Sequence, residues 1–159
     1  LIGRGHRNIA MLAGRFSPYI LGERYRAFLE VTQAHGLPAD TRHIKLCDPT
    51  VESAAEACRE LLSRPDRPTA IFGTNDVVAA GAMKAARRLS LRLPEELAGT
   101  GLDDASVCGM LEPELTSVHI DCRRMGELSV ARLQALLAGE TDVPQVTVVP
   151  TELRVRGSS

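Results

Sequence analysis

Residues 67–76 have the sequence Arg67-Pro68-Thr69-Ala70-Ile71-Phe72-Gly73-Thr74-Asn75-Asp76 and carry the strongest structural signal in the chain. A short apolar run ends here in small and polar residues, and a helical pattern follows at once. This order is typical of a buried parallel strand that delivers Asn75 and Asp76 to the start of the next helix. A second apolar run, residues 97–102, leads into two aspartates in the same way. Because ligands of open α/β sheets bind beyond the carboxyl ends of the strands, the two runs predict a binding cleft.

Strand-like and helix-like patterns alternate along the chain up to residue 102. Apolar runs predict strands over residues 9–13, 43–47, 69–72 and 97–102. Helical spacing predicts helices after a loop at 15–22, over 51–62 and over 77–89. Thr50 is expected to cap the second of these helices. Four strand–helix steps in series predict an α/β fold, a parallel doubly wound sheet with helices on both faces.

The pattern changes after this point. We expect a loop or short helix over residues 105–113, a strand over 115–120 and a helix over 122–138. Two short β-branched strands are expected over 146–149 and 153–155. Gly139 is expected to end the helix. Pro150 separates the last two strands, and since proline lacks the N–H that a central strand needs, we expect a kink or a crossover between layers there.

Size and composition limit the possible functions. A chain of 159 residues is one ordinary domain, and a net charge of -1 with 25% charged residues gives no electrostatic footprint for nucleic acid. No apolar run is long enough to cross a membrane, and no signal peptide opens the chain. The four cysteines lack zinc-site spacing and are expected to be reduced thiols of a cytoplasmic protein, with a disulfide as the alternative: Cys47, Cys58, Cys108 and Cys122. No cofactor, metal ion or catalytic group is predicted.

Six blocks of sequence occur in the order and spacing of a known family. They are residues 5–10 (GHRNIA), 23–28 (ERYRAF), 67–72 (RPTAIF) with Asn75 and Asp76, 91–97 (LRLPEEL) with 101–104 (GLDD), 113–118 (PELTSV) and 153–158 (LRVRGS). Together they cover essentially the whole chain. In them the chain resembles the effector-binding module of the lactose-repressor (LacI/GalR) family of bacterial transcription regulators. The resemblance implies a periplasmic-binding-protein-like (type I) fold.

The resemblance also implies how the chain is divided. Residues 1–8 would be the end of an N-terminal-subdomain helix and the first crossover, and residues 9–118 would be the C-terminal effector-binding subdomain. Residues 119–150 would be a remnant helix and strand of the N-terminal subdomain, and residues 151–159 would be the strand that returns to the C-terminal subdomain. The rest of that subdomain and the helix-turn-helix DNA-binding headpiece would then be absent. We expect the helix over 122–138 to have an apolar face that is exposed, disordered or covered by another chain. This face carries Met125, Leu133, Leu136 and Leu137.

The resemblance implies an effector site built from Arg24, Asn75 and Asp103. Arg24 matches the effector-clamping arginine of the family, and its fork of donors suits sugar hydroxyls, phosphate or carboxylate. Asn75 and Asp103 match ligand-contacting positions, and a carboxylate can accept two hydroxyl hydrogen bonds. Each has a plainer alternative: a solvated helix arginine for Arg24, an N-cap for Asn75 and a turn residue for Asp103. We expect a capping or helix-dipole role for Asp76 and a turn role for Asp104.

Less polar positions complete the implied site: Pro18, Ile20, Pro49 and Ile120. Better-known members of the family often have polar or aromatic contacts at these positions, and aromatic residues make up only 3% of this chain. These departures indicate a less polar effector.

The resemblance further implies a homodimer interface. Its expected residues lie on a helix and on the loop after the fourth strand: Ala80, Lys84, Met110 and Leu111. A Met-Leu pair in a loop otherwise rich in glycine, proline and acidic residues supports burial between chains. The alternative is that this pair anchors the loop onto its own sheet.

The sequence therefore predicts the effector-sensing module of a LacI-type regulator. The effector would be a small sugar-like or nucleobase-like molecule, and operator DNA would be contacted only through the absent headpiece, with no membrane partner. The alternative is a periplasmic sugar-binding protein of a transporter, which shares the fold. An enzyme is disfavoured because Gly3-Arg4-Gly5 and Gly99-Thr100-Gly101 do not complete GxGxxG and no nucleophile elbow or P-loop occurs.

Overall fold

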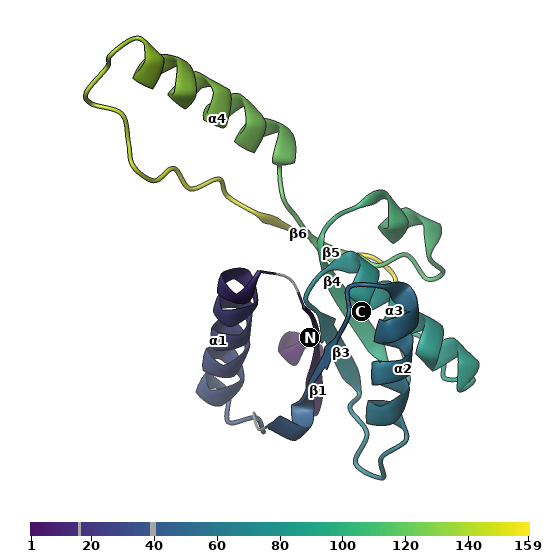
Figure 1. The fold of residues 1–159 in the computed structure, drawn as a ribbon. Coiled ribbons are helices and arrows are strands. Elements are labelled where there is room, and N and C mark those ends of the chain that lie inside the picture. Colours follow the sequence, from purple (N-terminus) through teal and green to yellow (C-terminus); the bar gives the residue numbers. More distant parts are fainter. Residues whose placement is uncertain (16, 39–40) are drawn as a thin grey trace.

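The computed structural model describes residues 1–15, 17–38 and 41–159 and is built on a 6-stranded sheet in the order β2-β1-β3-β4-β5-β6 (Figure 1). The strands are β1 (Ile9–Gly14), β2 (Ile44–Cys47), β3 (Ala70–Gly73), β4 (Ala98–Asp103), β5 (Thr116–His119) and β6 (Glu152–Arg154). The first five are parallel, and β6 pairs antiparallel with β5. The predicted parallel, doubly wound sheet is thus confirmed, with one antiparallel strand added at its edge.

Helices cover both faces of this sheet, as predicted (Figure 1). They are α1 (Pro18–Ala34), α2 (Val51–Leu62), α3 (Asp76–Arg88) and α4 (Cys122–Leu137), with short 3-10 turns η1 (Ile2–Arg4), η2 (Thr41–His43) and η3 (Ser106–Met110). In β1, Met11 packs on the α1 side with Phe28, whereas Leu12 packs with Cys58 and Leu61 of α2. Every residue of β1 is buried because side chains from both faces meet covering helices.

The packing of α2 against α3 depends on small residues. A Cβ built at Gly81 of α3 would overlap the Cβ of Ala54 and would lie 2.7 Å from the carbonyl oxygen of Val51. The two helices can therefore approach closely only with glycine at this position. Thr50 caps α2 as predicted, since its Oγ1 accepts a hydrogen bond from the Ser53 amide at 3.2 Å.

The predicted loop over residues 15–22 is wrong for most of its length. Phe16 lies outside the described residues, but α1 already begins at Pro18, with Ser17 at its N-cap position. Proline is favoured in the first helical turn because its fixed φ suits the helix and the missing N–H would be unpaired there. Tyr19 and Ile20 are exposed, so this first turn lacks the buried stripe on which the sequence pattern depends.

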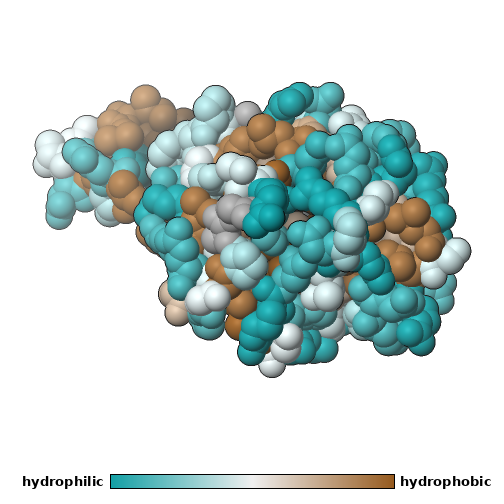
Figure 2. Space-filling view, turned by 90° about the horizontal axis from the view of Figure 1, so that it is seen from below, coloured by the Kyte–Doolittle hydropathy of each residue, from teal (hydrophilic) through white to brown (hydrophobic). Residues whose placement is uncertain are grey.

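The segment after β5 leaves the rest of the molecule as an arm made of α4 and the chain that returns to β6 (Figure 1). No residue of α4 is buried, and Leu133 and Leu137 are 57% and 79% exposed. This agrees with the expectation that the apolar face of α4 is exposed. The view from below shows hydrophobic surface on the part of the molecule that projects with this arm (Figure 2).

The predicted strand over residues 146–149 is wrong. This segment is extended coil, and Val146 and Val148 are 78% and 84% exposed. A strand needs a neighbour for its backbone hydrogen bonds, and among residues 1–15, 17–38 and 41–159 none lies beside this segment. Gly139 does end α4, with a positive φ of 81°.

Within the same described ranges, no helix combines the length and apolar character that a membrane span requires. Three of the four cysteines are buried and Cys122 is exposed, and all four are free thiols.

Candidate functional site

Thr74 joins the carboxyl ends of two neighbouring strands. It is fully buried, its Oγ1 accepts a hydrogen bond from the Gly14 amide at 2.9 Å, and its own amide donates to the Leu12 carbonyl at 3.0 Å. The ends of β1 and β3 are therefore held together at one edge of the sheet. The carbonyl oxygen of Thr74 accepts a hydrogen bond at 2.5 Å from Nη1 of Arg24, which reaches over from α1.

Asn75 is the N-cap of α3. Its Oδ1 accepts a hydrogen bond from the Val78 amide at 2.9 Å, which satisfies one of the free amides at the helix start. The capping alternative for Asn75 is thus confirmed. Within the described part of the chain, the Nδ2 group of Asn75 donates no hydrogen bond, so it is open to a ligand.

Asp103 ends β4 beside these residues. Its carboxylate accepts no hydrogen bond from residues 1–15, 17–38 or 41–159, and it lies close enough to Arg24 and Asp76 to sense both charges. Partial burial raises the pKa of Asp103 above its usual value, Arg24 partly offsets that rise, and Asp76 adds to it. Asp103 is thus a desolvated carboxylate with unused acceptor capacity. Arg24 thus lies near Asp103 and bonds to Thr74, the residue before Asn75; the strand-end pattern predicts only Asn75 and Asp103, and the family resemblance adds Arg24.

Asp104 has a different environment from its neighbour. Its Oδ1 accepts a hydrogen bond from Arg156 Nη2 at 2.6 Å, and its Oδ2 lies 3.1 Å from Nδ1 of His119. Burial alone would raise the pKa of Asp104, but the hydrogen bonds and charges of Arg156 and His119 outweigh it and lower that pKa. Asp104 has a φ of 56° and is already paired with Arg156 and His119, which agrees with the turn role expected for it.

Asp76 does not cap α3, contrary to one of the two expected roles. It lies in the first turn, but the capping side chain is Asn75. Asp76 is 1% exposed, and its two oxygens accept hydrogen bonds from Ser117 Oγ at 2.5 Å and from the Ala105 amide at 2.7 Å. Its position at a helix N-terminus remains favourable for a negative charge.

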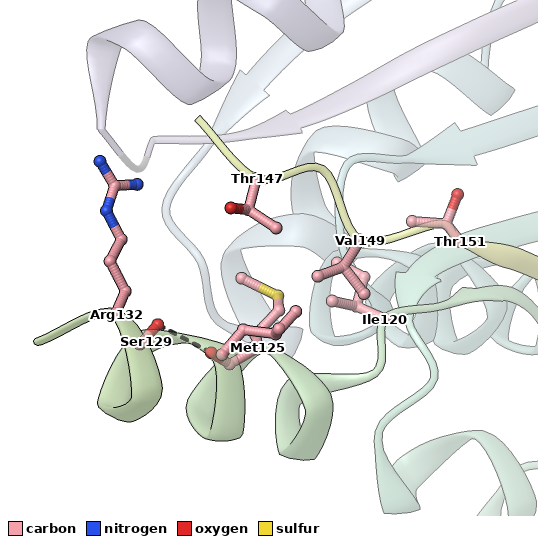
Figure 3. Close-up of a pocket in the computed structure, with 8 residues that line it drawn as sticks. Ile120, Met125, Ser129, Arg132, Thr147, Val149 and Thr151 are labelled. Atoms are coloured by element: carbon pink, nitrogen blue, oxygen red, sulfur yellow. Dashed lines mark hydrogen bonds between the residues drawn. The ribbon is translucent and has the colours of Figure 1, made fainter. Parts of the chain in front are cut away.

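The less polar predicted positions lie farther apart. Pro18 and Ile20 are in the exposed first turn of α1, and Pro49 is exposed in the turn between β2 and α2. Ile120 lies between β5 and α4 and, with Met125, lines a pocket of about 370 Å³ between α4 and the returning chain (Figure 3). The structure therefore places Ile120 with the arm. Pro18 lies on α1, the helix that carries Arg24, and Pro49 follows the carboxyl end of β2.

Three of the four expected interface residues line one groove. A cavity of about 470 Å³ lies between α3 and η3, and its lining includes Ala80, Lys84 and Leu111. Met110, the residue before Leu111, is 78% exposed. Lys84 donates a hydrogen bond to Glu52 at 2.8 Å.

Three residues of the site were missed from the sequence: Thr74 as the acceptor for Arg24, Ser117 and Arg156. Ser117 and Arg156 come from distant segments and acquire a role only when β5 and the C-terminal segment lie beside β4. Thr74 acts through its backbone carbonyl, which no side-chain pattern reveals. In the part of the chain that the structure describes, no three His, Cys, Asp or Glu side chains gather as metal ligands would.

The fold is an open, mostly parallel α/β sheet, a class of fold in which ligands bind beyond the carboxyl ends of the strands. The whole chain, residues 1–159, matches the periplasmic binding protein-like domain and belongs to that family. It is 32% identical over 158 residues to the HTH-type transcriptional repressor PurR of Yersinia pestis bv. Antiqua (strain Antiqua), an alignment that covers 99% of this chain and 46% of the repressor.

Solved structures of regulators have the same fold. A transcriptional regulator CelR–cellobiose complex matches with a TM-score of 0.92 and 34% identity, over 100% of this chain and 49% of that one. The lac repressor dimer bound to operator and the anti-inducer ONPF matches with a TM-score of 0.91 and 27% identity, over 100% of this chain and 55% of the repressor. The resemblance to lactose-repressor-family regulators is thereby confirmed. This chain spans about half the length of the curated relatives it matches.

Proposed function

We propose that this chain is the effector-sensing part of a LacI-type transcriptional regulator in the cytoplasm. The observation that carries the proposal is the unused hydrogen-bonding capacity gathered at one edge of the sheet. The Asp103 carboxylate lies close to Arg24, and the free Nδ2 of Asn75 belongs to the same strand-end cluster. Buried or half-buried polar groups are normally paired, so three incompletely used groups in one place support a ligand site.

The chemistry of these groups suits a small polyol or a nucleobase. Asp103 accepts hydrogen bonds from hydroxyl or N–H donors, whereas Arg24 and Asn75 donate to hydroxyl, carbonyl or ring-nitrogen acceptors. Neighbouring sugar hydroxyls, or the edge of a base, offer both kinds of group a few ångströms apart. Pro18, Ile20 and Pro49 would border the ligand on a less polar side, and Ile120 would do so only from the crossover into the arm.

Regulation would follow from a shift between subdomain arrangements. A ligand held here and by a facing subdomain favours the arrangement that it binds more tightly, and only this difference in affinity moves the equilibrium. The regulator would act as a homodimer through Ala80, Lys84, Met110 and Leu111 and would contact operator DNA through a separate headpiece. The relatives are transcription regulators, which favours this function over a transporter's sugar-binding protein and over an enzyme.

A thermal-shift screen of sugars, sugar phosphates and nucleobases on the full-length protein tests the proposal. We expect at least one compound to raise Tm, and Asp103→Ala to abolish that rise. Asp66→Ala is the matched control, because it removes an exposed aspartate from the loop before β3. A stabilising compound that acts equally on wild type and Asp103→Ala would remove Asp103 from the site.

A further inference from the structure

The turn that carries Asp103 has an unfavourable backbone. Asp103 and Asp104 are consecutive non-glycine residues with φ of 115° and 56°, in the left-handed region that ordinary side chains rarely adopt. Such a conformation persists only where its surroundings determine it. The direction of the Asp103 side chain depends on this backbone, so whatever holds the turn also aims the carboxylate.

A buried network holds this turn. The Asp104 amide donates to Ser117 Oγ at 3.1 Å, and the next amide, of Ala105, donates to Asp76 Oδ2 at 2.7 Å. Ser117 Oγ in turn donates to Asp76 Oδ1 at 2.5 Å. Two successive amides of the turn are therefore held by the Asp76 carboxylate: the Ala105 amide bonds to it directly, and the Asp104 amide bonds to it through the Ser117 hydroxyl.

The space for this carboxylate exists because position 101 is glycine. A Cβ built at Gly101 would overlap Asp76 Oδ1 and would lie 3.1 Å from the Leu115 side chain. Asp76 is also 1% exposed, so it cannot reach a ligand in the cleft. Its two carboxylate oxygens accept hydrogen bonds from Ser117 Oγ, which itself holds the Asp104 amide, and from the Ala105 amide.

We propose that Asp76, acting with Ser117, is a positioning residue of the effector site: it fixes the backbone of residues 103–105 so that the Asp103 carboxylate stays beside Arg24. This inference rests on the proposed function, because it assigns Asp76 a role in the site that Asp103 serves. Without the two acceptors of Asp76, the turn relaxes toward ordinary φ values. The Asp103 carboxylate then leaves the position beside Arg24.

A purely stabilising role is the competing explanation, since an acid in the first turn of α3 also benefits from the helix dipole. The two explanations differ in which part of the protein is destabilised when Asp76 is replaced. Loss of a helix-end charge weakens α3 or the whole domain, whereas loss of positioning loosens residues 103–105 and leaves the rest intact. Thr50→Ala is the matched control, because it removes the side-chain cap of α2 and touches none of the turn.

Hydrogen–deuterium exchange of the full-length protein, measured by mass spectrometry, distinguishes the positioning role of Asp76 from a purely stabilising role, and it needs no ligand. In Asp76→Ala we expect peptides over 101–108 to exchange at least about tenfold faster while peptides from α2 are unchanged. Ser117→Ala, which leaves Asp76 in place, should accelerate the same peptides to a smaller extent, and it serves as the test if Asp76→Ala does not fold. Unchanged exchange over 101–108, or equal acceleration throughout the domain, would overturn the inference.

Binding is measured in parallel with cellobiose, lactose and hypoxanthine as probes. If a probe binds wild type, Asp76→Ala should weaken it about as much as Asp103→Ala does, and Thr50→Ala should not. Equal binding by Asp76→Ala and wild type would contradict positioning. If no probe in this panel and none in the wider thermal-shift screen binds, the proposed function fails, and the exchange result still decides whether Asp76 holds the turn.

Discussion

The guanidinium of Arg24 donates a hydrogen bond to the carbonyl oxygen of Thr74 at 2.5 Å, joining the first helix to the end of β3. Nη1 of Arg24 is thereby fixed, and the other N–H groups of its guanidinium are held near Asp103 before any ligand binds. A side chain ordered in advance loses less conformational entropy on binding. Arg24 is therefore more than a solvated surface arginine.

Arg24→Lys should weaken effector binding by about 10- to 100-fold, because a lysine ammonium cannot hold the Thr74 carbonyl and direct further donors at a ligand in a fixed plane. Isothermal titration with the compound found in the thermal-shift screen measures the change. Arg26→Lys is the control on the same helix, since Arg26 is exposed and bonds only to Glu23 and Glu30 among the described residues. If the two substitutions weakened binding equally, a special role for Arg24 would be contradicted.

Asn75 has two roles that two substitutions can separate. Asn75→Ser keeps an oxygen that caps α3 but loses the amide donor, whereas Asn75→Ala loses both. We expect Asn75→Ala to lower the free energy of unfolding by about 0.5–2 kcal/mol and Asn75→Ser to change it little. Both should weaken effector binding. Urea unfolding and titration calorimetry measure the two effects, and full-strength binding by Asn75→Ser would leave Asn75 with capping alone.

Effector binding should weaken on acidification at a higher pH than an ordinary aspartate would cause. Burial raises the pKa of Asp103, partly offset by Arg24, so the carboxylate takes up a proton earlier as pH falls. The protonated form loses acceptor capacity for ligand hydroxyls. For the free protein the sign is opposite: a raised pKa in the folded state means that this group adds stability as pH falls through it. Binding and unfolding free energies measured across acidic pH test both signs, with Asp103→Asn as the control that lacks this one titrating group.

The sequence predicted the centre of the sheet because β1 and β3 are buried almost throughout and therefore appear as uninterrupted apolar runs. The strand ends at Asn75 and Asp103 followed from the same pattern. The start of α1 did not, because Tyr19 and Ile20 are exposed and give no buried stripe. The predicted strand at 146–149 failed for a different reason: its β-branched residues indicate strand propensity, but pairing depends on a neighbour elsewhere in the chain.

The network behind Asp103 shows a second limit of sequence reasoning. Asp76 looked like a helix-capping residue because its position in the motif suits that role. Its actual partners, the Ala105 amide and Ser117 Oγ, lie 29 and 41 residues away and meet it only when β4 and β5 pair. A local pattern can place a carboxylate at a helix start, but it cannot show which distant backbone groups the carboxylate holds.

Met110 and Leu111 should matter for dimer formation. Met110→Asp places a charge on an exposed apolar side chain next to the groove between α3 and η3, and should weaken dimerisation by about tenfold or more if this surface is buried between chains. Sedimentation equilibrium of the full-length protein measures the dimer dissociation constant. Val31→Asp is the control, since Val31 is 51% exposed on α1 and belongs to another face. Equal dissociation constants for the two variants would favour the alternative that the loop simply anchors to its own sheet.

Gly81→Ala should destabilise the protein although alanine is the better helix former. Helix propensity alone would favour alanine by about 1 kcal/mol. The added Cβ would, however, overlap Ala54 and press on the Val51 carbonyl of α2, and overpacking of this kind costs about 1–3 kcal/mol. Gly22→Ala in α1 meets nothing within 4 Å and should instead stabilise by about 0.5–1 kcal/mol. The urea midpoints of the two variants, compared at equal m-values, show whether each substitution stabilises or destabilises the protein. A Gly81→Ala protein as stable as Gly22→Ala would mean that α2 and α3 can move apart without cost, which their buried alanine contacts do not permit.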